Sequence, residues 1–230
     1  MTDPNVGSHD VLAPLAESPV IGLLGGTGDQ GLGLAYRWSG AGISVMIGSR
    51  DAKRAAQAAS SLPGSASGDS NLAVAEACDI AVIAVPWAGH ADLISALPQE
   101  LAGKIVIDCV NPLGFDKRGA FALPVPEGSA AEQAQQLLPD SVVVGAFHNV
   151  SSVLLKDESL AEVATDTLVL GDVKEATDEV QRLAAMIPGM RGVFGGRLRN
   201  SSQIEALTAN LISINRRYKA HAGIRITDVN

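Results

Sequence analysis

Short apolar runs alternate with segments of helical spacing along most of this chain. The first run, residues 20–24, leads through a glycine-rich turn into a segment with helix-spaced apolar residues as far as Trp38. Further strands are predicted at residues 43–48, 64–68, 79–85, 104–109 and 141–147, with helices between them and a loop over 115–128. The continuous apolar run 79–85 is typical of a buried parallel strand. This alternation predicts an α/β fold, a Rossmann-like doubly wound and mostly parallel sheet.

The alternation of apolar runs and helical segments changes near residue 152. Beyond it the pattern predicts a strand over 165–170, a helix over 173–186, a short strand over 190–194 and a long amphipathic helix over 199–220. We interpret residues 19–152 as a nucleotide-binding domain and 153–230 as a small α/β C-terminal domain. The apolar face of the last helix fits a cleft cover, a dimer contact or plain internal packing. That face contains Ile204, Leu207, Leu211 and Ile214.

Composition narrows the choice of class. Hydrophobic residues make up 47% of the 230 residues, which is enough for a sizeable core. The formal net charge of −8 argues against nucleic acid or an anionic membrane as a partner. Cys78 and Cys109 show no metal-type spacing and fit reduced core thiols of a cytoplasmic protein better than a disulfide. Residues 1–18 lack the basic start and apolar core of a signal peptide and are expected to be a disordered leader.

The glycine-rich turn carries the first functional signal. It has the form Gly26-x-Gly28-x-x-Gly31 between a predicted strand and a predicted helix. The first glycine permits the turn, the second lets the backbone approach a pyrophosphate, and the third lets the helix pack on the strand. The free N–H groups and the dipole of the helix start attract the same pyrophosphate. The turn therefore predicts a dinucleotide site.

The end of the second predicted strand indicates which dinucleotide. An NAD site places Asp or Glu there for the ribose 2′-hydroxyl, whereas this chain has Ser49 and Arg50, with Arg54 one helical turn further on. Guanidinium groups four residues apart can face one anion, here a 2′-phosphate. The alternative is that Ser49 caps the helix and both arginines are solvated. We expect NADP, with Asp51 pointing away at the helix start.

Candidate ligand-contact residues lie at the carboxyl ends of three further predicted strands. They are Val85, Pro86 and Trp87 after the first, Asn111 and Pro112 after the second, and His148, Asn149, Val150 and Ser152 after the third. Ligands of doubly wound sheets bind beyond the carboxyl ends of the strands, so these residues are candidates for contact with the nicotinamide and a second ligand. The alternatives are a helix-start proline, a packing tryptophan and a structural histidine.

Several catalytic motifs are absent from the sequence. No His or Cys group has zinc spacing, and there is no Gly-Lys-Ser/Thr, Gly-x-Ser-x-Gly or cleft-facing Tyr-x-x-x-Lys. We therefore expect no metal site and no acid–base catalytic residue. This inventory suits direct hydride transfer between two bound cofactors, which needs aligned rings more than a proton donor.

At the level of motifs the chain resembles the NADPH-dependent deazaflavin reductases, the F420:NADP oxidoreductases. The residues that carry the resemblance are Leu24-Gly25-Gly26-Thr27-Gly28, Gly48-Ser49-Arg50, Cys78-Asp79-Ile80-Ala81-Val82, Val85-Pro86-Trp87, Ser129-Ala130-Ala131-Glu132, Phe147-His148-Asn149 and Asn200-Ser201. The resemblance extends from Val20 to the C-terminus. It implies a Rossmann domain with a small C-terminal domain, a homodimer, and reversible hydride transfer between NADP(H) and the deazaflavin of coenzyme F420.

The resemblance also implies roles for individual residues. Thr27, Ser49, Arg50 and Arg54 fall where the family holds the 2′-phosphate, and Gly26, Gly28, Asp29 and Gln30 belong to the pyrophosphate turn. Val85, Pro86, Trp87, Ala91 and Ser152 fall on the NADP cleft toward the nicotinamide. Asn111, Pro112, His148, Asn149 and Val150 fall on the deazaflavin side, where His148 is a candidate orienting residue. The chain departs from some relatives at Asp29, which is acidic where they have asparagine.

Two alternatives keep the NADP site and change the reaction. One is an NADPH-dependent reductase of another acceptor, such as a flavin, a ferric chelate or a small imine or ketone. The other is a non-catalytic NADP sensor, because a cofactor fold does not by itself establish catalysis.

Overall fold

The computed structural model of this chain describes residues 12, 16 and 18–229. The leader expected at residues 1–18 lies almost wholly outside the described residues. Among those that are described, no helix is long and apolar enough to cross a membrane.

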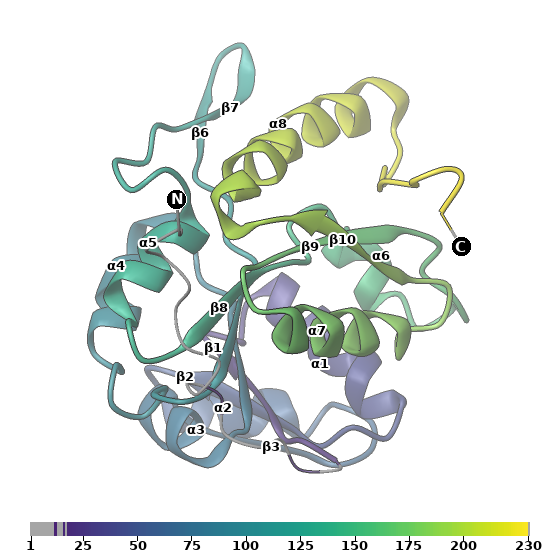
Figure 1. The fold of residues 1–230 in the computed structure, drawn as a ribbon. Helices are drawn as coiled ribbons and strands as arrows, with labels where there is room; N and C mark the ends of the chain where they lie inside the picture. Colours follow the sequence, from purple (N-terminus) through teal and green to yellow (C-terminus); the bar gives the residue numbers. More distant parts are fainter. Residues whose placement is uncertain (1–11, 13–15, 17, 230) are drawn as a thin grey trace.

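An eight-stranded sheet runs through the middle of the structure, in the order β10-β9-β8-β5-β4-β1-β2-β3 (Figure 1). The strands are β1 Ile21–Leu24, β2 Val45–Ser49, β3 Ala66–Ser70, β4 Ile80–Ile83, β5 Ile105–Asp108, β8 Val142–Gly145, β9 Asp166–Leu170 and β10 Arg191–Gly196. From β3 to β8 in this order every pairing is parallel. The order β3-β2-β1-β4-β5-β8 is that of a dinucleotide-binding sheet. The predicted doubly wound, mostly parallel sheet is confirmed.

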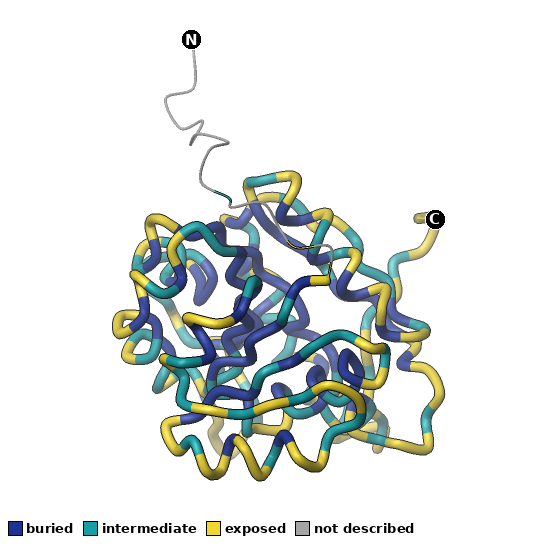
Figure 2. Tube along the Cα trace, turned by 90° about the horizontal axis from the view of Figure 1, so that it is seen from below, coloured by how far each residue is buried: buried dark blue, intermediate teal, exposed yellow. Residues whose placement is uncertain are grey.

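Helices cover both faces of the sheet. They are α1 Asp29–Gly40, α2 Ala52–Ala59, α3 Asn71–Ala77, α4 His90–Ser95, α5 Ala130–Leu137, α6 Ser152–Lys156, α7 Lys174–Ala185 and α8 Ser201–Tyr218, with short 3₁₀ turns η1 Trp87–Gly89 and η2 Leu198–Asn200. Side chains alternate along a strand, so Leu23 of β1 packs into the apolar cluster that contains Trp38 of α1. Leu24 packs into the opposite cluster with Val74 of α3. Buried residues therefore gather in the interior of the structure, and exposed residues lie on its outside (Figure 2).

Residues 115–122 do not form the predicted loop. A hairpin of β6 Leu113–Asp116 and β7 Gly119–Ala122 stands beside α8 (Figure 1). The Asp116 carboxylate accepts hydrogen bonds from the backbone N–H groups of Arg118 and Gly119, and Gly119 has a φ of 124°. A short polar side chain before a glycine is a turn signal that the flanking prolines obscured.

The strands of residues 153–230 join the main sheet. β9 pairs antiparallel with β8 through Gly145 and Leu170, and β10 pairs parallel with β9. Asp166 of β9 ties the C-terminal tail back onto this edge, because its buried carboxylate accepts hydrogen bonds from Arg191, Arg225 and the backbone N–H of Ile226. The two guanidinium groups and that backbone N–H hold the Asp166 pKa below its usual range. The domain boundary at residue 152 stays a prediction.

Candidate active site

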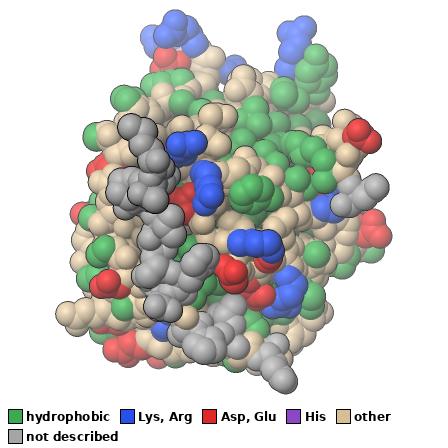
Figure 3. Space-filling view, viewed as in Figure 1, with side chains coloured by type: hydrophobic (Ala, Val, Ile, Leu, Met, Phe, Trp, Pro, Cys, Tyr) green, Lys and Arg blue, Asp and Glu red, His purple; other side chains and the backbone are tan. Residues whose placement is uncertain are grey.

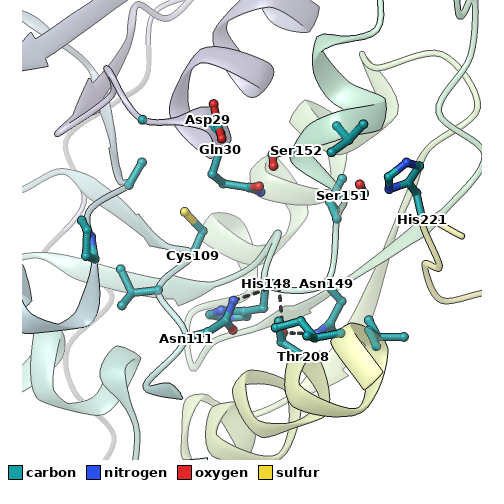
Figure 4. Close-up of a pocket in the computed structure, with 18 of the residues that line it drawn as sticks. Asp29, Gln30, Cys109, Asn111, His148, Asn149, Ser151, Ser152, Thr208 and His221 are labelled. Carbon is teal, nitrogen blue, oxygen red and sulfur yellow. Dashed lines mark hydrogen bonds between the residues drawn. The ribbon is translucent and has the colours of Figure 1, made fainter. Parts of the chain in front are cut away.

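A cavity of about 510 Å³ lies at the carboxyl ends of β1, β4, β5 and β8 (Figure 4). The residues that directly follow these strands, the strand exits, line one side of the cavity. Helices α6 and α8 and the chain after α8 line the other side. The lining residues are Gly28, Asp29, Gln30, Ala84, Val85, Pro86, Trp87, Cys109, Val110, Asn111, His148, Asn149, Val150, Ser151, Ser152, Val153, Thr208, Leu211, Ile212, Asn215, His221 and Ala222. This is the crevice in which doubly wound sheets bind their ligands.

The structure brings most of the predicted site residues to this cavity. The predicted residues that line it are Gly28, Asp29, Gln30, Val85, Pro86, Trp87, Asn111, His148, Asn149, Val150 and Ser152. The predicted residues that do not line it are Gly26, Thr27, Ser49, Arg50, Arg54, Ala91 and Pro112. The second set includes all the residues predicted to bind the 2′-phosphate. These residues lie at and after the carboxyl ends of β1 and β2.

The glycine turn is fixed from three directions. The Gly26 N–H donates to the carbonyls of Leu23 and Gly48, and the Gly25 N–H donates to Oδ1 of Asn71 at 2.9 Å. Gly25 has a φ of 68°, a backbone conformation that favours glycine. The start of α3 therefore holds the turn through Asn71, a contact that the sequence pattern does not reveal.

The glycine at position 28 faces open space. A Cβ built there would meet no heavy atom within 4 Å, and Gly28 itself lines the cavity. It precedes α1 in an extended conformation and has no side chain to cap that helix. The backbone N–H groups at the start of α1 are therefore open to an anion that comes from the cavity.

The predicted 2′-phosphate residues form an open, cationic end of β2. Ser49 is buried, and its Oγ accepts a hydrogen bond from the Asp51 backbone N–H at 3.2 Å. Asp51 caps α2 by accepting from the N–H groups of Lys53 and Arg54. The alternative in which Ser49 caps this helix is therefore wrong, and the Asp51 carboxylate is engaged by the helix, as expected. The side chains of Arg50 and Arg54 are exposed and form no ion pair with a described residue.

His148 is buried without a hydrogen-bond partner. Its side chain lines the cavity, only 4% of the residue is exposed, and neither ring nitrogen bonds a described residue. Burial lowers the pKa of His148 to about 4, against the opposing charge of Asp108. The ring is therefore neutral at pH 7, with one nitrogen to donate and one to accept. The alternative, a structural histidine whose ring nitrogens are hydrogen-bonded within the protein, is therefore wrong for the described residues.

The backbone around His148 is held from both sides of the cavity. The carbonyl of His148 accepts hydrogen bonds from Nδ2 of Asn111 and from Oγ1 of Thr208, each at 3.0 Å (Figure 4). Nδ2 of Asn149 donates to the same Thr208 hydroxyl at 2.8 Å. These bonds join the β5 exit, the β8 exit and α8. They leave Oδ1 of Asn111 and Oδ1 of Asn149 buried and without a partner among the described residues.

The preceding residue, Phe147, has a strained backbone conformation just after the end of β8. It is fully buried and has a φ of 61°, which is rare for an aromatic residue. Its N–H donates to Oγ1 of Thr167, its carbonyl accepts from Nε2 of Gln30, and its ring packs edge-on against Trp38. The surrounding contacts thus impose the turn that aims His148 and Asn149 at the cavity.

A buried polar cluster lies at the end of β5. Nε2 of His90 lies 2.6 Å from the Asp108 carboxylate, and Nδ1 lies 2.9 Å from Oε1 of Gln133. Burial favours the neutral ring, but the Asp108 hydrogen bond and charge outweigh it and raise the pKa of His90. Glu205 of α8 accepts from the N–H groups at the start of α5, and burial raises its pKa to about 7. This cluster joins α4, α5 and α8 to the sheet.

The two cysteines are free and buried, as expected. Cys109 lines the cavity, but its thiol donates to the carbonyl of Ile83, and burial raises the pKa of the thiol. A thiol held in its protonated form is a poor nucleophile.

Some cavity residues have no motif in the sequence. Thr208, Asn215 and His221 come from α8 and the following segment, and their position at the cavity depends on how α8 packs. Lys156 at the end of α6 lies 2.5 Å from the Asp29 carboxylate. The chain separates this pair by 127 residues, so no local pattern could reveal it.

This chain is similar to known proteins in sequence and in fold. The family described as NADP oxidoreductase, coenzyme F420-dependent, matches residues 20–112. A protein named F420-dependent NADP reductase from Methanothermobacter marburgensis is 37% identical over 91% of this chain and 98% of its own length. One of the same name from Methanocaldococcus jannaschii is 38% identical over 91% of this chain and 98% of its own. A crystal structure of a proposed F420-dependent NADP reductase from Arthrobacter sp. FB24 is 26% identical with a TM-score of 0.76, and the match covers 91% of this chain and 99% of that one.

Proposed function

This chain belongs to the family of coenzyme F420-dependent NADP oxidoreductases, and we propose that it transfers a hydride reversibly between NADP(H) and F420. One observation carries the proposal beyond the family: a single cavity joins the glycine turn to a set of unpartnered polar atoms around His148. The glycine turn fits a dinucleotide diphosphate. The unpartnered polar atoms around His148 fit a planar ring with amide and carbonyl groups.

On the NADP side, the start of α1 offers N–H groups to the diphosphate beside Gly28, Asp29 and Gln30. Thr27, Ser49, Arg50 and Arg54 are the proposed 2′-phosphate ligands, because guanidinium groups bind phosphate with charge-assisted hydrogen bonds. Val85, Pro86, Trp87, Ala91 and Ser152 are the proposed neighbours of the nicotinamide end, which supplies or accepts the hydride.

On the acceptor side, the proposed ligands are Asn111, Pro112, His148, Asn149 and Val150. A neutral His148 can donate one hydrogen bond and accept another without leaving a charge near the hydride path. Oδ1 of Asn111 and Oδ1 of Asn149 can accept from N–H groups of the ring. These residues orient the acceptor, and orientation is the main contribution that a hydride transfer between two rings requires from the protein.

We propose a homodimer for the active enzyme. Hydrophobic side chains gather over α8 and the neighbouring hairpin (Figure 3). The exposed ones are Phe115, Phe121, Ile214 and Tyr218. Apolar groups exposed together on neighbouring elements are typical of an interface between copies. Residues 153–230 would then cover the cleft and, together with the hairpin, form the dimer contact. The two free thiols are in keeping with a reducing compartment, for which we propose the cytoplasm.

The activity is tested by mixing the protein with NADPH and oxidised F420 and following the absorbance of both. Coupled oxidation of NADPH and reduction of F420 is expected, and NADP⁺ with reduced F420 should give the reverse reaction. Free flavin, a ferric chelate and a cyclic imine serve as competing acceptors. Turnover of one of these in preference to F420 would overturn the choice of acceptor, and NADPH binding without any turnover would indicate a sensor.

A further inference from the structure

An acidic side chain stands where the proposed function puts a diphosphate. Asp29 follows Gly28, begins α1 and lines the cavity, and 74% of its side chain is exposed. The chain as a whole carries a net charge of −8, so it offers no general attraction for an anion. A carboxylate at this position repels a diphosphate unless a cation compensates it.

Lys156 supplies that cation. Its Nζ lies 2.5 Å from Oδ1 of Asp29. It is the last residue of α6, whose first residues, Ser152 and Val153, line the same cavity. The pair therefore sits at the rim of the cavity, between the glycine turn and the residues proposed for the nicotinamide end.

The fold holds the backbone of Lys156 close to the turn. Gly33 of α1 lets α6 approach, because a Cβ at position 33 would lie 2.7 Å from Cβ of Leu155 and 3.5 Å from Cγ of Lys156. Arg37 of α1 is buried and donates to the carbonyls of Leu154, Leu155, Asp157 and Leu160. The bonds to Leu154 and Leu155 satisfy carbonyls at the C-terminal end of α6, and those to Asp157 and Leu160 hold the segment that follows it. Lys156 thus reaches Asp29 from a docked helix and not from a free loop.

We propose that Lys156 is a positioning residue for the cofactor diphosphate. It neutralises Asp29, so that the N-terminus of α1 accepts an anion that Asp29 alone would repel, and its ammonium group can bond either the carboxylate or the diphosphate. This proposal rests on the proposed function, because that function places the NADP diphosphate on the glycine turn.

The test is a double-mutant cycle on NADPH binding, measured by titration calorimetry with Lys156→Met, Asp29→Asn and the double variant. Lys156→Met is expected to raise the Kd for NADPH about tenfold, because the Asp29 carboxylate is then left uncompensated beside the diphosphate. Asp29→Asn should lower the Kd for NADPH, because the Lys156 ammonium group then faces the diphosphate without a competing carboxylate. The double variant should lie within about threefold of the wild type.

Lys174→Met is the matched control. Lys174 is also an exposed lysine paired with an aspartate, Asp178, but on α7 and not at the cavity. It should leave the Kd unchanged. Adenosine 2′-phosphate, which lacks the diphosphate, should bind the Lys156→Met variant and the wild type equally well. Thermal unfolding of each variant checks that α6 remains docked.

Three results would overturn the proposal. A double variant as weak as Lys156→Met would mean that Asp29 is not what Lys156 compensates. An equal loss for adenosine 2′-phosphate would mean a general field effect, and an unchanged Kd for Lys156→Met would remove the role entirely. Wild-type protein that binds NADPH without reducing F420 would overturn the proposed activity alone, whereas wild-type protein that does not bind NADPH would overturn both.

Discussion

Gly31 and Gly26 are in close backbone contact: a Cβ on Gly31 would lie 2.6 Å from the Cα of Gly26. This contact packs the first turn of α1 against the loop that follows β1. Gly28 lies between the two in sequence and has the opposite surroundings, since a Cβ there would meet no heavy atom within 4 Å. One motif therefore contains a glycine needed for packing and a glycine that leaves room for something outside the protein.

Alanine substitutions should separate these two roles. Gly31→Ala is expected to lower the free energy of unfolding by about 1–3 kcal/mol, because the new methyl group collides with backbone that cannot yield. Gly28→Ala should leave that free energy within about 1 kcal/mol of the wild type and raise the Kd for NADPH about tenfold or more. Urea unfolding and NADPH titration measure the two quantities. A Gly28→Ala protein with wild-type affinity would contradict a diphosphate at this turn.

Arg50 should select NADPH over NADH. Arg50→Ala is expected to raise the Kd for NADPH about 10- to 100-fold, because a charge-assisted hydrogen bond to the 2′-phosphate is lost. NADH lacks that phosphate, so its Kd should change less than about twofold. Arg118→Ala, an exposed arginine paired with Asp116 on the hairpin, is the control. Equal losses for NADPH and NADH would show that Arg50 does not bind the 2′-phosphate.

His148 should make the protein acid-sensitive. Burial lowers its folded-state pKa from 6.5 to about 4, so the unfolded chain binds a proton at this residue over a range in which the folded protein does not. The contribution of His148 to stability is complete above the unfolded pKa and is lost as the pH falls toward 4. His148→Gln should therefore lose less stability than the wild type, by about 2 kcal/mol, between roughly pH 6.5 and pH 4.5.

Urea unfolding of both proteins at the two pH values measures this difference. Glu205 titrates with the opposite sign, since its raised pKa of about 7 removes stability as the pH rises from 4.5 to 7. Both proteins contain Glu205, so its effect cancels in the comparison. Identical pH dependence for the wild type and His148→Gln would contradict a buried, neutral His148.

Thr208 should matter for the acceptor and not for NADPH. Thr208→Val keeps the shape of the side chain but removes the hydroxyl that donates to the His148 carbonyl and accepts from Asn149. We expect the KM for F420 to rise about 3- to 10-fold and the KM for NADPH to stay within about twofold. Ser213→Ala, which removes an exposed hydroxyl of α8 that bonds its own helix, is the control. A rise in both KM values would mean that α8 shapes the whole cavity and not its acceptor side.

Much of the site could be predicted because it sits at strand ends. Gly28, Trp87, Asn111 and His148 each follow an apolar run, and parallel strands bring their carboxyl ends to one edge. The Ser129-Ala130-Ala131-Glu132 segment forms a capping box, whose hydrogen bonds between Ser129 and Glu132 span only three residues. The hairpin at 113–122 was missed, since its short strands lie among prolines that favour a loop.

The sequence by itself determined the order of strands and helices outside the hairpin and α6, the glycine turn at 26–31 and the candidate residues at the strand exits. Each of these depends on local periodicity or on the backbone freedom of glycine, which a short segment contains in full. Only the tertiary structure decided that Lys156 lies against Asp29, that Thr208 and Asn149 bond at the exit of β8, and that His148 is buried without a partner. These relationships require helices distant in sequence to dock on the sheet, and the docking depends on the packing of the whole core.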